Sequence, residues 1–226
     1  MYRNLFDLII NVAEADDLAD DNGMGFLLIP DWAFDILHEF VYQFQGFCQF
    51  RTTFAATTSN SNKTLTDNQT ETLELLKQNK DVWAVETVMY YLHRMLSFVR
   101  SAHPSVKPGH KTLGVFASVA LSRLECLLGD YQASLMALDP IYRGTSGASA
   151  DIAAAVDDEV SSVFAAKISL AYHAGVSYLM LRRYKDAINF LGDICSQINR
   201  GLKVSKFSIT IQISSESFLL IGLELI

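Results

Sequence analysis

Two adjoining helical periodicities between Ile168 and Gly201 constrain the fold of this chain more than any other feature. In each half of this segment, apolar residues recur every three or four positions, which is the spacing of one buried face on an α-helix. The segment is therefore predicted to form two antiparallel helices joined by a tight turn. The periodic residues are Ile168, Ala171, Tyr172, Gly175, Tyr178 and Leu179 in the first helix, and Tyr184, Ala187, Ile188, Leu191, Ile194 and Ile198 in the second.

Small residues stand where these two helices would approach each other most closely. Gly175 in the first helix and Ala187 in the second leave room for close contact between the backbones. Tyr178 and Tyr184 follow the glycine at three and nine positions, within a unit of 34 residues. This spacing is typical of the tetratricopeptide repeat, a helix pair that stacks on further copies of itself.

A degenerate copy of the same pattern precedes this segment. A helix is expected over residues 112–128, a turn at Gly129 and Asp130, and a returning helix after the turn. A distance of 53 residues separates the two equivalent tyrosines, against 34 in a plain array, so an inserted loop is expected at residues 142–163. The matching positions are Ser122 with Gly175, Tyr131 with Tyr184, and Ser134 with Ala187.

These patterns predict an all-α fold of stacked antiparallel helix pairs, in three regions. Residues 1–110 form an N-terminal helical region with loops at 13–29 and 52–69, and residues 111–201 hold the helix pairs. Residues 202–226 form an atypical tail, in which Ile209, Ile211 and Ile213 alternate with polar residues as they would in a strand. The acidic stretch at 14–21 fits either a solvated linker or a contact for a basic partner.

The helix expected after Pro30 is unusually aromatic. Phe34, Tyr42 and Phe50 lie partly off its main apolar stripe. Such a helix is either buried on several sides or offers an aromatic surface to another protein. We therefore treat these three residues as a candidate partner surface.

Composition and motifs argue against several classes of function. Half of the residues are hydrophobic and 19% are charged, which excludes a disordered chain. A net charge of −7 disfavours direct nucleic-acid binding, although a local basic patch leaves RNA contact open. The cysteines at positions 48, 126 and 195 are too scattered to predict a disulfide framework or a zinc site.

The search for catalytic motifs is negative. Residues 107–112 lack the frame of a phosphate-binding loop, Ser146 does not lie in a nucleophile elbow, and the five histidines do not cluster in the sequence. We therefore expect neither an enzyme nor a bound cofactor or metal. No apolar run approaches the ~20 residues that span a bilayer, so the chain is interpreted as cytoplasmic and without a membrane contact.

Several stretches taken together resemble one known family. They read LFDLI at 5–9, WAFDI at 32–36, EFVYQFQ at 39–45, VWAV at 82–85, LLGDY at 127–131 and YLMLRRYKDA at 178–187. In this order they are similar to subunit L of eukaryotic translation initiation factor three, over roughly residues 2–200. The run at 42–45 argues against the alternative, a scaffold subunit of another complex of this type such as the proteasome lid or the signalosome.

The resemblance implies a non-enzymatic helical-repeat subunit of a large cytoplasmic complex. Its implied partners are the other subunits of the initiation factor and the small ribosomal subunit. In that family the repeats lead into a C-terminal module with a winged helix, the PCI module, through which subunits associate. This chain is expected to be a partial one that lacks the module and to bind through its repeats.

Overall fold

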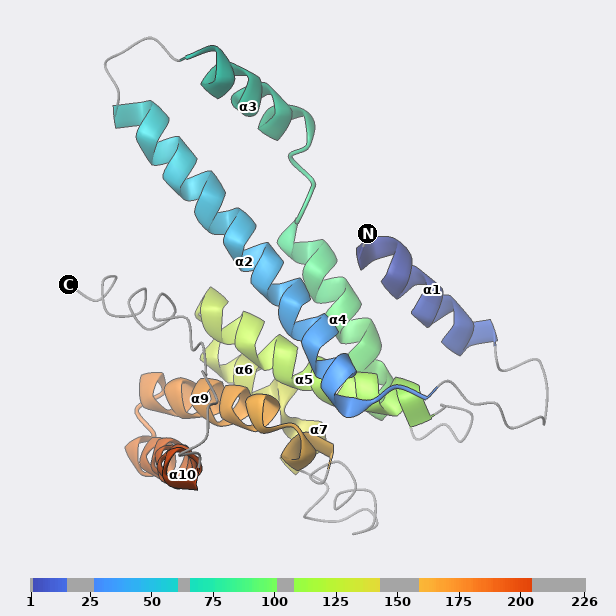
Figure 1. Ribbon diagram of the computed structural model, residues 1–226, viewed down its shortest axis with the longest axis vertical. Helices are drawn as coiled ribbons and strands as arrows, with labels where there is room; N and C mark the ends of the chain where they lie inside the picture. Colours follow the sequence, from blue (N-terminus) through green and yellow to red (C-terminus); the bar gives the residue numbers. More distant parts are fainter. Residues whose placement is uncertain (1, 16–26, 61–65, 101–107, 143–158, 205–226) are drawn as a thin grey trace.

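The computed structural model describes residues 2–15, 27–60, 66–100, 108–142 and 159–204. Within these ranges the regular structure is helical and no strand occurs, so the predicted all-α class is confirmed (Figure 1). The strand-like period expected in the tail lies outside the described residues. The helices are α1 (Tyr2–Ala15), α2 (Pro30–Asn60), α3 (Asp67–Gln78), α4 (Val85–Arg100), α5 (Pro108–Leu128), α6 (Tyr131–Ala137), α7 (Asp139–Tyr142), α9 (Phe164–Met180) and α10 (Tyr184–Val204).

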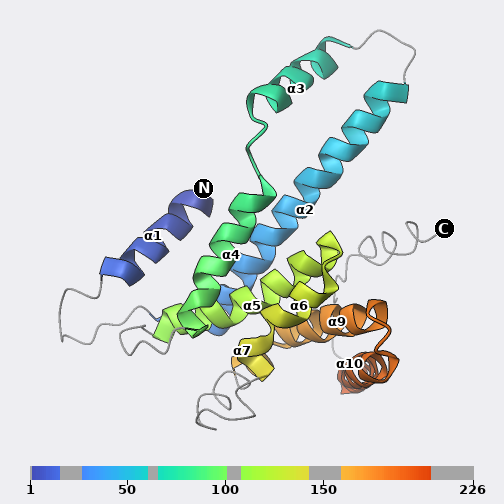
Figure 2. The ribbon, with the colours of Figure 1, turned by 180° about the vertical axis from the view of Figure 1, so that it is seen from behind.

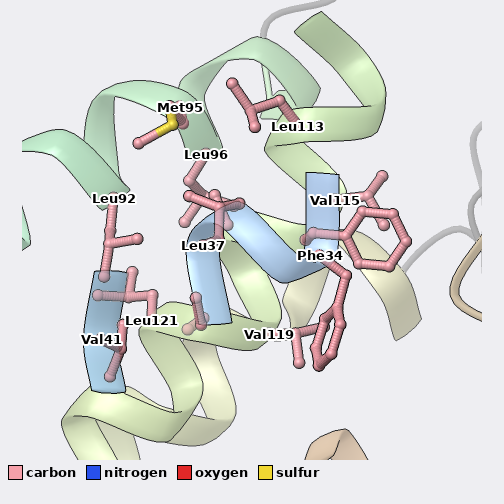
Figure 3. Packing of buried hydrophobic residues seen from close by; sticks show 14 of the residues in the cluster. Phe34, Leu37, Val41, Leu92, Met95, Leu96, Leu113, Val115, Val119 and Leu121 are labelled. Carbon is pink, nitrogen blue, oxygen red and sulfur yellow. The ribbon is translucent and has the colours of Figure 1, made fainter. Parts of the chain in front are cut away.

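Helix α5 is the centre around which the others pack. It contacts α2, α4, α6 and α9, and almost all of its side chains from Gly109 to Glu125 are buried. A helix that is apolar on all sides requires such a position, because no face of it can be left to water. Figure 3 shows the core on one side of α5, where Val41 of α2, Leu92 of α4 and Leu121 of α5 converge.

The contact between α4 and α5 depends on a glycine. A Cβ atom at Gly114 would lie 2.8 Å from the backbone oxygen of Met95 and 2.6 Å from Cγ2 of Val99. Only a residue without a side chain allows the two backbones to come this close. Gly114 therefore fixes how deeply α4 lies against the central helix.

Helix α1 is held against α2 and α4 by aromatic and polar contacts. The fully buried ring of Phe6 packs edge-on against Phe40, with their centroids 4.8 Å apart. The Tyr91 hydroxyl of α4 donates to Oδ1 of Asp7 at 2.8 Å. These contacts join the beginning of the chain to the core.

The pairs α5–α6 and α9–α10 close with the same turn. Each turn contains one residue with a left-handed backbone, with φ 84° at Gly129 and 61° at Arg182. In both turns two backbone amides donate to carbonyls three and five residues earlier, which is the Schellman motif of helix ends. The four bonds are Gly129 to Cys126 (3.2 Å), Asp130 to Glu125 (3.0 Å), Arg182 to Leu179 (3.0 Å) and Arg183 to Tyr178 (2.8 Å).

The structure corrects the expected loop boundaries. Helix α1 extends to Ala15, α2 extends to Asn60 and α3 begins at Asp67. The parts of the predicted loops at 13–15, 52–60 and 67–69 are therefore wrong. The threonine-rich end of α2 is helical, and within it the hydroxyls of Thr52, Thr57 and Thr58 bond to carbonyls four residues back. The described ends of the predicted insertion at 142–163 are also helical, in α7 and at residues 159–162.

Candidate functional site

Three buried serine hydroxyls join α5, α6 and α9. Ser177 Oγ donates to Ser134 Oγ at 3.0 Å, and Ser134 Oγ lies 3.0 Å from Ser122 Oγ and 2.8 Å from the Ser122 carbonyl oxygen. All three side chains have no exposed surface. Small polar side chains let the helices approach closely and satisfy one another's hydrogen bonds inside the protein. Ser122 and Ser134 thus lie at a three-helix junction, with Ser177 as a partner that sequence reasoning missed.

The second helix pair closes at Gly175. A Cβ atom there would lie 2.6 Å from the Leu191 side chain of α10, and the facing Ala187 is 2% exposed. Tyr178 packs against Phe190 with the ring centroids 5.3 Å apart, and its ring lies 4.6 Å from the guanidinium carbon of Arg183. These contacts hold α9 and α10 together at the end near the turn.

The tyrosine that begins α6 and the tyrosine that begins α10 differ in burial. Tyr131 is half-buried at the start of α6. Tyr184 was expected to pack between its helices, but 57% of its surface is exposed and it lines an outer groove beside Ala187. Helix α9 packs against α6, the helix that Tyr131 begins.

A buried arginine connects α2 to α5. Arg123 Nη1 lies 3.0 Å from Nδ1 of His38, and its Nη2 donates to Oε1 of Gln45 at 2.9 Å. Burial lowers the pKa of Arg123, and the nearby Tyr42 raises it. The neutral side chains of His38 and Gln45 accept hydrogen bonds from this guanidinium and tie the long helix α2 to the centre of the fold.

Two histidines near this arginine are held neutral. Burial first, and then the charge of Arg123, lower the pKa of His38 to about 4, while Glu39 acts in the opposite direction. The pKa of His173 on α9 is also lowered to about 4, mainly by burial. A hydrogen bond to the Ser169 backbone raises the pKa of His173, and Arg123 and His38 lower it further. At the junction of α2, α5 and α9, Arg123 is therefore the cation, and the rings of His38 and His173 are neutral.

The candidate partner surface is corrected at one of its three residues. Phe34 is only 5% exposed, packs 6.0 Å from Phe116 and 5.1 Å from His38, and points towards α5 in Figure 3. Its assignment to a partner surface is wrong, because α5 covers the side of α2 that the sequence pattern left outside the main stripe. Tyr42 and Phe50 are each 48% exposed.

Phe50 belongs to a projecting feature, the α2–α3 arm, which we define as residues 47–60 and 66–78. Figures 1 and 2 show from opposite sides that these segments extend beyond the other helices. Phe50 stacks on Phe54 with the centroids 5.9 Å apart, and α3 has no buried residue. The arm is kept helical by local bonds, including a capping box between Thr66 and Gln69. Apolar side chains of the arm, such as Phe50 and Leu75, are therefore exposed on the surface.

Little else in the described residues is arranged for chemistry. No group of three or more His, Cys, Asp or Glu side chains there could hold a metal ion. No described helix combines the length and apolar character needed to cross a membrane. The candidate sites that remain in these residues are surfaces of packed helices.

A family model decides the classification. The model described as RNA polymerase I-associated factor PAF67 matches residues 1–217. The chain belongs to this family. Among the relatives of this PAF67-family chain are the proteins named "Eukaryotic translation initiation factor 3 subunit L" of Aspergillus niger, Aspergillus oryzae and Aspergillus terreus. Each is 29% identical over 224 residues, covering 91% of this chain and 41% of the relative. The resemblance predicted from the sequence motifs is confirmed.

The PAF67-family chain therefore spans less than half the length of these relatives.

Several of its structural residues were not found from the sequence. Ser177 and Gly114 carried a usable signal, because each is a small residue within an apolar helical period. Arg123 and His38 are 85 positions apart, and no local pattern connects them.

Proposed function

We propose that this chain is a non-catalytic scaffold subunit of the translation initiation factor 3 complex in the cytoplasm. The observation that carries the proposal is its identity of 29% over 91% of its length with relatives named as subunit L of that factor. The stacked helices support it, since such arrays present extended surfaces rather than one deep reactive pocket.

The proposed mechanism is passive. The helix pairs hold partner proteins in a fixed geometry, and no substrate is turned over. The proposed partners are other subunits of the initiation factor and, directly or through them, the small ribosomal subunit. A net charge of −7 favours contacts with protein over contacts with RNA.

Affinity purification of the tagged chain from its source cell tests this proposal. We expect other subunits of the initiation factor and proteins of the small ribosomal subunit to be recovered with it. Recovery of neither group would contradict the proposal. Recovery of proteasome-lid or signalosome subunits instead would establish the alternative scaffold, which the names of the relatives do not favour.

Tyr42 and Phe50 are proposed as contacts for a partner subunit. Both side chains are half-exposed on one long helix, and Phe50 lies on the projecting arm. Because large aromatic side chains dominate the energetics of protein interfaces, Phe50→Glu should remove at least one partner subunit from the purified complex. Leu128→Glu is a matched control, since Leu128 is 49% exposed at the far end of α5. Identical sets of partners with wild type and Phe50→Glu would refute this contact.

A further inference from the structure

The guanidinium of Arg123 lies between α2 and α5 with neutral groups as its described partners. It donates to Oε1 of Gln45 at 2.9 Å, and its Nη1 lies 3.0 Å and 3.3 Å from the two ring nitrogens of His38. Within the described ranges no Asp or Glu side chain hydrogen-bonds to it. Burying a charge costs free energy that an opposite charge usually offsets, and burial lowers the pKa of Arg123 accordingly.

Glu39, the neighbour of His38 in the sequence, does not supply that opposite charge. Its carboxylate accepts a hydrogen bond from Nε2 of Gln43 on the exposed side of α2. Glu39 raises the pKa of His38, whereas burial and Tyr42 are what act on the pKa of Arg123. A carboxylate that came from elsewhere would therefore provide the charge that the described residues do not place beside Arg123.

The Arg123 cluster, which we define as His38, Tyr42, Gln45 and Arg123, reaches the surface of the protein. Tyr42 is 48% exposed, and the other three side chains are partly exposed. A guanidinium has five N–H donors, and the bonds to His38 and Gln45 use Nη1 and Nη2 alone. The guanidinium therefore keeps donors for a ligand that arrives from solvent.

The charge of this cluster selects the class of ligand. The pKa values of His38 and His173 are lowered to about 4, so at neutral pH Arg123 is the cation among these three side chains. One positive charge matches one carboxylate, whereas the repeated charges of a nucleic-acid backbone need more cations than the described groups here supply. A carboxylate can also accept two parallel hydrogen bonds from one guanidinium.

We propose that the Arg123 cluster is a binding site for one carboxylate group, supplied by a protein side chain or by a free carboxylic acid. This inference goes beyond the scaffold proposal, because it assigns a chemical class of ligand to residues that the scaffold role does not require. Its first test uses the chain alone, so its failure would leave the proposed membership of the initiation factor complex unaffected. Failure of that membership would likewise leave the site in place.

Titration with acetate at neutral pH provides the first test. Sodium acetate replaces sodium chloride at constant ionic strength, and NMR follows the Arg123 side chain and the His38 ring in the 226-residue chain. We expect a saturable shift of both signals, because the bound carboxylate lies beside these two groups.

Two variants with the same chemical change show whether acetate binds at Arg123. Gln45→Glu puts a carboxylate where the Gln45 oxygen accepts from Arg123, so it should weaken acetate binding by at least about tenfold. Gln78→Glu, at an exposed site on α3, should bind acetate as the wild type does.

Affinity purification of the same tagged variants from the source cell identifies the source of the carboxylate. Loss of one partner protein by at least about fivefold with Gln45→Glu, but not with Gln78→Glu, assigns the carboxylate to a side chain of that partner. An unchanged set of partners, together with saturable acetate binding, assigns it to a free carboxylic acid.

Two results would overturn the inference. One is that the Arg123 and His38 signals are the same in acetate as in chloride. The other is equal binding of acetate by wild type and Gln45→Glu, which would place the anion away from Arg123.

Discussion

At the scale of single residues, the glycines of the helices differ in what faces them. Gly114 faces a backbone oxygen of α4, Gly175 faces the end of the Leu191 side chain, and Gly46 has nothing within 4 Å of an added Cβ atom. A leucine side chain can move to another rotamer, whereas a backbone oxygen within a packed helix cannot move without shifting the helix. The same chemical change should therefore have different effects at the three positions.

Alanine substitutions test this ranking. Gly114→Ala should lower the free energy of unfolding by ~1–3 kcal/mol through overpacking, and Gly175→Ala should lower it less. Gly175→Leu, which leaves Leu191 no space, should again cost ~1–3 kcal/mol. Gly46→Ala should raise stability by ~0.5–1 kcal/mol, because alanine favours the helix. Urea unfolding measures all four variants, and equal effects of Gly114→Ala and Gly46→Ala would contradict the described α4–α5 contact.

The neutral histidines predict how stability depends on pH. His38 and His173 have pKa values of about 4 in the folded chain, against 6.5 for an ordinary histidine. Between these values the unfolded chain binds protons that the folded chain excludes, so stability is complete above about pH 6.5 and falls towards pH 4. In this window His173→Gln should reduce the slope of the unfolding free energy against pH. The reduction should correspond to at most about one fewer proton taken up on unfolding. A slope unchanged by this substitution would show that His173 is protonated equally in both states.

At the scale of elements, the two helix pairs share one turn geometry but differ in how well the residue at the turn suits its backbone conformation. Their turns share backbone geometry and hydrogen bonds, yet the left-handed position holds glycine in one and Arg182 in the other. A side chain in that conformation costs roughly 1–2 kcal/mol, which glycine avoids. The α9–α10 turn is therefore the more strained of the two.

Exchanging these residue types should have opposite effects. Arg182→Gly should raise the melting temperature by relieving a strain of about 1 kcal/mol, and Gly129→Ala should lower it by a similar amount. Thermal unfolding followed by circular dichroism measures both. Destabilisation by both variants would mean that Arg182 makes contacts worth more than its backbone strain.

Prediction from the sequence succeeded where information is local. The periodicity between residues 112 and 201 placed both helix pairs, and the small residues Ser122 and Ser134 mark the contact between α5 and α6. It failed at Phe34, because one periodic stripe does not reveal that α5 covers the side of α2 on which Phe34 lies. It also failed at 52–60, where a segment rich in Thr, Ser and Asn was interpreted as a loop although it continues α2.

At the scale of the whole molecule, the described residues form a stack of helices with two exposed apolar features. The α2–α3 arm extends beyond the other helices (Figures 1 and 2). An apolar groove lined by Tyr184, Ile188 and Leu191 lies on the α9–α10 pair. Two separate surfaces allow one scaffold to contact two partners at once, and each contact then raises the effective concentration of the other partner. This arrangement supports the scaffold role proposed above.

Sedimentation of a lysate from cells that express the tagged chain tests the scaffold account most directly. The account predicts that the chain sediments with small ribosomal subunits and other subunits of the initiation factor, and that Phe50→Glu moves part of it to the free fractions. A wild-type chain found entirely in the fractions of a free 25.2 kDa protein would contradict the account.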